Sequence, residues 1–180
     1  MLLAKELKKT NISEYLIYMF QVEDLIRINS NDIEKLDKSL ISKFKQPKNQ
    51  TLEIYKWYKA LCRMMNEERL QEGGHLQFVA NQVKELTDFH YRLLEFTDDE
   101  IYKKLFYKAL PDIKIFINKI PSKPGSDIEV CLYALYSLLL MRLKKMSITA
   151  ETLEAMTNFS NLMAHLSKKY NEFEKGEMEI

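Results

Sequence analysis

The chain has 180 residues, of which 46% are apolar and 29% charged, so it suits one globular domain with a sizeable core. Its net charge of +1 provides no overall field that would draw it to nucleic acid or to an anionic membrane. Only four Gly and four Pro are present, too few for the many tight turns of a β-rich fold, and we predict an all-α protein.

Apolar periodicity and helix-capping residues predict a bundle of about seven helices. They are expected at residues 12–28, about 32–44, 52 to about 72, 76 to about 96, from Thr97 onwards, from Ser126 onwards and from Thr149 onwards. Gly73-Gly74 is typical of a helix end, because glycine readily adopts the left-handed conformation that closes many helices. Thr97 and Glu100 have the spacing of a capping box at the start of the fifth helix.

Three features divide the second half of the chain. Pro111 lies within the fifth helical pattern, and its missing backbone donor leads us to expect a kink or break near Leu110. The segment at residues 119–127 contains Pro and Gly and is the clearest loop, with the potential to act as a hinge. The tail at 175–180 is expected to fray. We therefore predict a single helical domain over residues 1–180.

The sixth helix contains the most apolar stretch of the sequence, VCLYALYSLLLM at residues 130–141, in which Ser137 is the single polar residue. Its length is well below the roughly 20 residues that a membrane-spanning helix needs. We therefore predict a buried core helix and no membrane association. The first helix is nearly as apolar, and we expect these two helices to be the most buried.

Four charged or titratable residues lie on apolar helix faces, and this is unusual because an isolated buried charge is costly. Glu23 and Arg27 have the spacing of a helical ion pair on the first helix. His90 is at the centre of the apolar stripe of the fourth helix, and Arg142 shares a sector with apolar residues of the sixth. We take Glu23, Arg27, His90 and Arg142 as a candidate ligand-binding cluster. The alternative is structural: a buried pair that fixes helix register, a hydrogen-bonded core histidine and an arginine that extends to solvent.

A weaker alternative is a metal site made of Glu68, Glu72 and His75. Two carboxylates one helical turn apart and a nearby imidazole are chemically suitable ligands for a divalent ion. The sequence has no H-E-x-x-H motif, Gly-rich phosphate loop or G-x-S-x-G elbow, so we expect neither a metal nor a cofactor. His165 points away from the apolar face of its helix and is expected at the surface.

The two cysteines, Cys62 and Cys131, do not have metal-binding spacing, and each lies in an apolar helical pattern. Buried free thiols are the simplest interpretation. The first residues lack the continuous apolar stretch of a signal peptide. Together these features predict a cytoplasmic location.

Several segments resemble an uncharacterised bacterial family, known chiefly from Bacteroidetes, that is classed as a domain of unknown function. They are KTNISEYLIYMFQVEDLIR, GGHLQF, LTDFHYRLL, YKALPDI and SDIEVCLYALYSLLLMRLKK, which follow one another along nearly the whole chain. The resemblance implies a bacterial, all-helical, single-domain protein. It implies no activity, cofactor or catalytic residue.

The function class predicted from these observations is a non-enzymatic module that binds a small molecule or another protein. The alternatives are a small helical enzyme, with a metal at Glu68, Glu72 and His75, and a subunit whose exposed Met and Tyr side chains form a homodimer interface. A binding module needs a concave pocket, whereas an enzyme needs a titratable pair within hydrogen-bond reach in a cleft.

Overall fold

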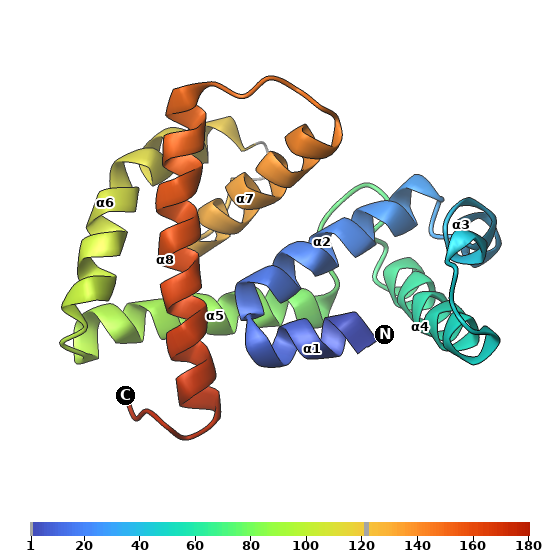
Figure 1. The fold of residues 1–180 in the computed structure, drawn as a ribbon, viewed down its shortest axis with the longest axis horizontal. Helices are drawn as coiled ribbons and strands as arrows, with labels where there is room; N and C mark the ends of the chain where they lie inside the picture. The colour runs from blue at the N-terminus through green and yellow to red at the C-terminus, as the bar shows by residue number, and fades with distance from the viewer. Residues whose placement is uncertain (1, 121–122) are drawn as a thin grey trace. The chain divides into compact units, whose positions relative to one another are not determined.

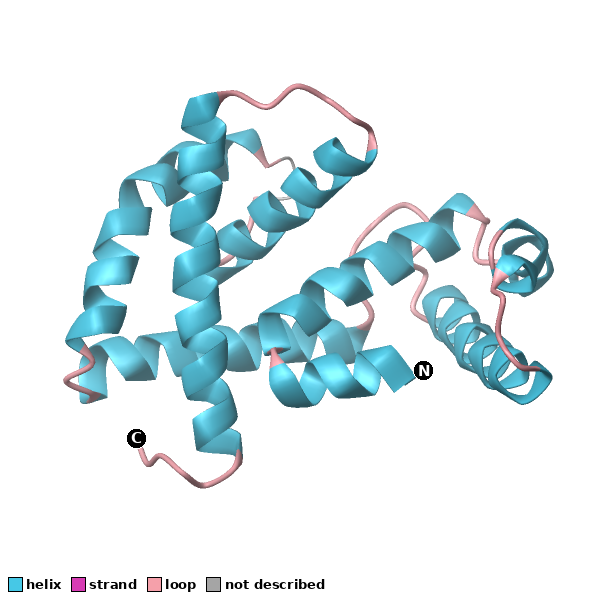
Figure 2. Cartoon of the chain, in the orientation of Figure 1, coloured by secondary structure: helices cyan, strands magenta, loops and turns pink. Residues whose placement is uncertain are grey.

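The computed structural model describes residues 2–120 and 123–180, and over these residues the chain is helical with no β-strand (Figure 2). The predicted all-α class is confirmed. The α-helices are α1 (Leu2–Thr10), α2 (Ile12–Ile28), α3 (Ile33–Ser39), α4 (Lys48–Glu67), α5 (Gln77–Phe96), α6 (Glu100–Phe116), α7 (Asp127–Leu143) and α8 (Ala150–Glu174) (Figure 1). Two short 3-10 helices, η1 (Ile41–Lys43) and η2 (Ile117–Lys119), follow α3 and α6.

Several helices begin where their capping residues predict. Helix α2 has the predicted bounds. The Ser126 hydroxyl accepts a hydrogen bond from the backbone N–H of Glu129 and caps α7, and Thr149 caps α8 in the same way through the N–H of Thr152. Helix α1 was not predicted, because its nine residues give only a short apolar pattern.

Helix α6 differs from its prediction in two respects. Its N-cap is Asp99, whose carboxylate accepts from the N–H of Tyr102, and not the Thr97 capping box. The helix continues through Pro111, so of the kink or break expected near Leu110 the break does not occur, and the kink stays a prediction; Figure 1 shows α6 as one curved ribbon. Because Ala109 and Ile113 are both fully buried on the turns beside Pro111, packing outweighs the loss of one backbone hydrogen bond.

The chain divides into two compact units. The first comprises residues 1–6 and 18–81. In it α3, η1 and α4 pack against one another, and their buried side chains include Leu36, Ile41, Leu61 and Met65. This unit contains the candidate functional site.

The second unit comprises residues 7–17 and 82–180. Here α6, α7 and α8 pack against one another. Most of the circumference of α7 is buried, apart from a stripe that includes Glu129, Tyr133 and Ser137. The buried residues are Ile128, Val130, Cys131, Leu132, Ala134, Tyr136 and Leu138. The prediction that this helix is among the most buried is therefore confirmed. No helix among the described residues combines the length and the apolar character required to cross a membrane.

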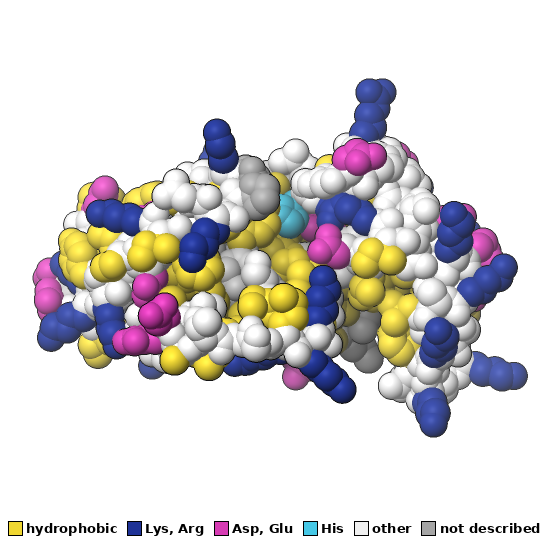
Figure 3. Space-filling view, turned by 90° about the horizontal axis from the view of Figure 1, so that it is seen from above, with side chains coloured by type: hydrophobic (Ala, Val, Ile, Leu, Met, Phe, Trp, Pro, Cys, Tyr) yellow, Lys and Arg dark blue, Asp and Glu magenta, His cyan; other side chains and the backbone are white. Residues whose placement is uncertain are grey.

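The surface carries mixed charge. On the face shown in Figure 3, Lys and Arg side chains alternate with Asp and Glu, and hydrophobic side chains lie between them. This agrees with the near-zero net charge of the sequence.

Candidate functional site

The connection between α4 and α5 determines the geometry of the site in the first unit. Helix α4 ends at Glu67, five residues before the predicted end at about residue 72, where Gly73-Gly74 follows. The N–H of Leu70 donates to Met65 O at 2.9 Å and the N–H of Arg69 donates to Asn66 O at 3.2 Å, which is a Schellman motif. Arg69 occupies the left-handed position with φ 57°, where glycine is usual, and for this reason the sequence did not reveal the end.

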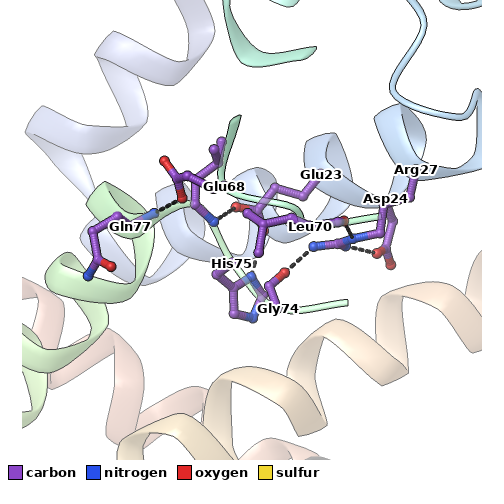
Figure 4. A network of polar contacts seen from close by, with 9 residues as sticks. Glu23, Asp24, Arg27, Glu68, Leu70, Gly74, His75 and Gln77 are labelled. Carbon is purple, nitrogen blue, oxygen red and sulfur yellow. Dashed lines mark hydrogen bonds and ion pairs between the residues drawn. The ribbon is translucent and has the colours of Figure 1, made fainter. Parts of the chain in front are cut away.

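Glu23 is fully buried on α2, and its carboxylate holds the start of α5 (Figure 4). One oxygen, Oε1, accepts from the backbone N–H of Leu76 at 2.8 Å. The other, Oε2, lies 2.5 Å from Nδ1 of His75, and the imidazole ring stacks on Phe20 with 4.0 Å between ring centroids. Each oxygen of the buried carboxylate therefore has a hydrogen-bond partner, which removes most of the cost of burying it.

Arg27 fastens the same connection to α2 (Figure 4). Its Nη1 contacts the Asp24 carboxylate at 2.6 Å, its Nε donates to Leu70 O at 3.1 Å, and its Nη2 donates to Gly74 O. The expected ion pair between Glu23 and Arg27 is not formed, because the guanidinium turns toward Asp24 and the two carbonyl groups. The guanidinium is thus already engaged within the chain.

The residues of the alternative metal site are also engaged or dispersed. Oε2 of Glu68 accepts from the N–H of Gln77 at 2.7 Å, so that Glu68 and Glu23 together cap the first turn of α5. Glu72 lies in the exposed connection after α4 and not one helical turn beyond Glu68. Among the described residues no group of three or more His, Cys, Asp or Glu could hold a metal ion.

A pocket of about 500 Å³ lies beside α4 in the same unit. It is lined by Asn31, Ile33, Lys56, Lys59, Ala60, Cys62, Arg63 and Asn66. Three of these residues are cationic and none is acidic or imidazole-bearing. Lys56 and Lys59 are exposed, and the exposed Arg63 makes only a long contact of 3.5 Å with Glu67.

Asn31 is the buried polar residue in the lining of this pocket. Only 3% of the surface of Asn31 is exposed. Neither Oδ1 nor Nδ2 of its side chain has a hydrogen-bond partner among the described residues. Its backbone is satisfied: the N–H donates to Ile26 O, and the carbonyl accepts from Nδ2 of Asn66. Both amide atoms lack a partner among the described residues and each exposes less than 1 Å² of surface, so the amide is enclosed rather than open to the pocket.

The neighbouring polar groups of the pocket are occupied or inactive. Oδ1 of Asn66 accepts from Nε2 of Gln71 at 3.3 Å, so both ends of that amide are engaged. Burial, assisted by the nearby Asp32 carboxylate, raises the pKa of Cys62 to about 11. The thiol is consequently protonated at neutral pH and is a poor nucleophile. The lining of the pocket therefore presents neither a carboxylate, an imidazole nor a thiolate at neutral pH.

In the second unit, His90 is fully buried and its Nδ1 forms a 2.5 Å hydrogen bond with the Tyr102 hydroxyl. Burial lowers the pKa of His90 to about 4, so the ring is neutral at pH 7. His165 is not the surface residue that its position predicted. Its side chain is 18% exposed, and its Nε2 lies 2.8 Å from the Asp99 carboxylate. Arg142 is exposed in the last turn of α7, where a positive charge favours the helix dipole.

Comparison with known proteins identifies the family. The sequence matches the family described as "Domain of unknown function (DUF4924)" over residues 1–177. The chain belongs to this family. Searches of curated proteins and of solved structures found no match.

The four residues of the predicted ligand cluster are divided between the two units. Glu23 and Arg27 belong to the first unit, and His90 and Arg142 to the second. Glu23 is joined to His75 and Arg27 to Asp24. A role of the four residues in contacting a ligand stays a prediction. Sequence reasoning missed Asn31, and the only signal for it is the INSND segment at residues 28–32, where asparagine tolerates a left-handed backbone.

Proposed function

We infer that this protein is a non-enzymatic binding module that holds a negatively charged small molecule in the pocket beside α4. The observation that carries the proposal is the set of three cations that line this pocket, Lys56, Lys59 and Arg63, with no carboxylate among the lining residues.

The charge of the ligand follows from the lining. Lys56, Lys59 and Arg63 lie on one face of α4 because their spacings of three and four residues match the helical repeat. The lining itself holds these three cations and no carboxylate, which favours an anion, although Asp32 lies near Cys62 and Glu67 contacts Arg63 at its edge. A volume of about 500 Å³ is within the range of small-molecule sites.

The location and origin of the protein are part of this proposal. The resemblance to a family known chiefly from Bacteroidetes supports a bacterial source. Cys62 and Cys131 are both buried free thiols, which supports a reducing compartment, and we place the protein in the cytoplasm. The homodimer alternative stays a prediction, and native mass spectrometry of the purified protein tests it together with any retained ligand.

The binding proposal is tested by isothermal titration calorimetry with sodium tripolyphosphate, a compact anion that carries phosphate groups alone and so probes the attraction of charge. We expect binding that weakens as salt is added, because the attraction is electrostatic. Lys59→Gln and Arg63→Gln should each lower the affinity by roughly three- to tenfold.

The matched control is Lys48→Gln, the same kind of change at an exposed residue of α4 that does not line the pocket. It should leave the affinity for tripolyphosphate unchanged. If Lys48→Gln weakened binding as much as Lys59→Gln did, the attraction would belong to the helix surface as a whole. Such a result, or the absence of binding by the wild type, would refute the anion pocket.

A further inference from the structure

Helix α6 packs on α7 and α8 with one side and exposes the other, which we call its outer face (Figure 1). The buried residues of the helix share the packed side: Tyr102, Phe106, Ala109 and Ile113. At about 100° per residue, the opposite side is a sector of roughly 140°. The large apolar and cationic residues of this sector are all exposed: Ile101, Lys104, Tyr107, Lys108, Lys114 and Ile115.

The large apolar residues of the outer face are each more than half exposed. Ile101, Tyr107 and Ile115 have exposed fractions of 63%, 65% and 55%. Single exposed hydrophobic residues are normal on a protein surface, but these three follow one helix face over about 21 Å. Because removing apolar surface from water is favourable, this face gains free energy when a partner covers it.

The cations of the outer face are only partly neutralised within the chain. Lys104 and Lys108 are exposed, and neither forms an ion pair with a described residue. Lys114 lies near Asp127 of α7, since burial raises the pKa of this carboxyl and Lys114 opposes the shift. Two unpaired positive charges therefore lie between the apolar residues at the two ends of the face.

The carboxylates of α6 beside this face do not offset the two charges. Glu100 is one turn before Lys104, but its carboxylate lies 3.9 Å from Lys103 instead, and Lys103 is equally far from Asp98. Asp112, just outside the sector, accepts a hydrogen bond from Nδ2 of Asn158 at 2.9 Å. The outer face thus carries a local positive charge although the whole chain is nearly neutral.

We propose that the outer face of α6 binds an amphipathic helix of a partner protein, whose carboxylates face the two unpaired lysines and whose apolar side chains cover Ile101, Tyr107 and Ile115. From Ile101 to Ile115 the outer residues recur in steps of three, four and seven, which is the spacing at which one helix packs along another. This inference goes beyond the anion pocket, because the pocket is in the first unit and α6 is in the second.

The arrangement of charge favours such a helix over other partners. Lys104 is at the centre of the sector and would point straight into a membrane, whereas interfacial helices keep their cations at the flanks. A second copy of the chain, bound by two-fold symmetry, would bring the lysines of both copies together. Nucleic acid would use the lysines but leave the three apolar side chains without a counterpart.

The experiment is fluorescence anisotropy of the full chain with three labelled synthetic helices of about 20 residues. The acidic probe has leucine and glutamate on one face, the reversed probe has lysine in place of every glutamate, and the polar probe has serine in place of every leucine. We expect the acidic probe to bind about tenfold or more tightly than either of the others, and to bind less tightly as salt is added.

Two substitutions test the two kinds of contact. Lys104→Glu should lower the affinity for the acidic probe by about tenfold, and Tyr107→Ser should lower it by roughly three- to tenfold. Both residues are exposed, so the fold should be preserved, which circular dichroism and urea unfolding check first. The matched controls are Lys84→Glu, at an exposed lysine of α5, and Ile28→Ser, at a residue that is 79% exposed. Neither control should change the affinity.

Three results would overturn this inference. If the acidic and reversed probes bound equally, or neither bound, the face would not select an acidic helix. If Lys59→Glu weakened the acidic probe as much as Lys104→Glu did, the cations of α4 would hold the probe, so the inference would be wrong and the anion pocket would stand. If vesicles of phosphatidylcholine and phosphatidylglycerol bound through Lys104 and Tyr107 while the acidic probe did not, the face would be a membrane-binding surface.

Discussion

Replacing the buried carboxylate of Glu23 tests the account of the α2–α5 connection most directly. The carboxylate is fully buried and accepts from the Leu76 N–H at 2.8 Å and from His75 at 2.5 Å. In Glu23→Gln the amide oxygen can still accept from Leu76, but the charged contact with His75 is lost. A hydrogen bond to a charged group is worth about 1.5–3 kcal/mol, so we expect the free energy of unfolding to fall by about 2 kcal/mol.

Glu23→Ala removes both contacts and leaves the Leu76 donor buried without a partner. We expect a loss of about 3–5 kcal/mol, which is a large part of the roughly 5–15 kcal/mol that stabilises a typical domain. Urea unfolding followed by circular dichroism measures both changes. His75→Phe retains the stacking on Phe20 without the donor, and a double-mutant cycle with Glu23→Gln should give a coupling energy of about 1 kcal/mol or more.

The control for this experiment is Asp24→Asn, the adjacent residue with the same exchange of carboxylate for amide. The Asp24 side chain is 42% exposed, and its contact with Arg27 should contribute less than about 1 kcal/mol. The reasoning would be refuted if Asp24→Asn and Glu23→Gln lowered the stability equally. It would also be refuted if Glu23→Ala unfolded at the urea concentration of the wild type.

Three further predictions concern helix ends and buried groups. Lys145 follows α7 with φ 53°, a conformation that glycine adopts more easily, so Lys145→Gly is expected to raise the free energy of unfolding by about 1 kcal/mol. Lys144→Gly, at φ −82°, should lower it. A rise in both variants or in neither would contradict the assignment of a Schellman motif to the end of α7. His90 has its pKa lowered from 6.5 to about 4 by burial, so the unfolded chain binds more protons between these values and stability is lost as pH falls from 6.5 to 4. Between pH 6.5 and 4 the free energy of unfolding should fall by about 3 kcal/mol less in His90→Gln than in the wild type, which urea unfolding at several pH values measures. The same pH dependence in the wild type and in His90→Gln would refute this role of His90. Cys62 and Cys131, whose pKa values burial raises, should react with a thiol reagent only after unfolding in guanidinium, and rapid reaction of the native protein would show that they are not buried.

Helix positions were predictable where a local signal determines them. Ser126 and Thr149 cap their helices as expected, since a cap depends on one side chain and a backbone donor three residues away. Helix ends were less predictable. Arg69 and Lys145 adopt left-handed conformations without being glycine, which indicates that tertiary packing and the Schellman hydrogen bonds override the local preference.

The contacts of the candidate site were beyond local signals. The sequence correctly marked Glu23 as a charge on an apolar face, but it favoured Arg27 as the partner because helical spacing was the only available distance. The structure supplies His75 instead, which is 52 residues away along the chain. Sequence spacing cannot reveal such a partner, because it depends on how the connection between α4 and α5 folds back on α2.

The buried polar groups of this protein separate into those with partners and those without, and this difference shows which of them the fold explains. Glu23 and Arg27 have intramolecular partners, which indicates that they stabilise the fold. His90 has an unpartnered Nε2, but it lies among aromatic rings, including that of Phe106 at 4.9 Å between centroids, and its lowered pKa keeps it neutral, so burial costs it little. Asn31 is less well satisfied, because neither the donor nor the acceptor of its neutral amide has a partner among the described residues. It is therefore the buried polar group whose position the contacts of the fold explain least.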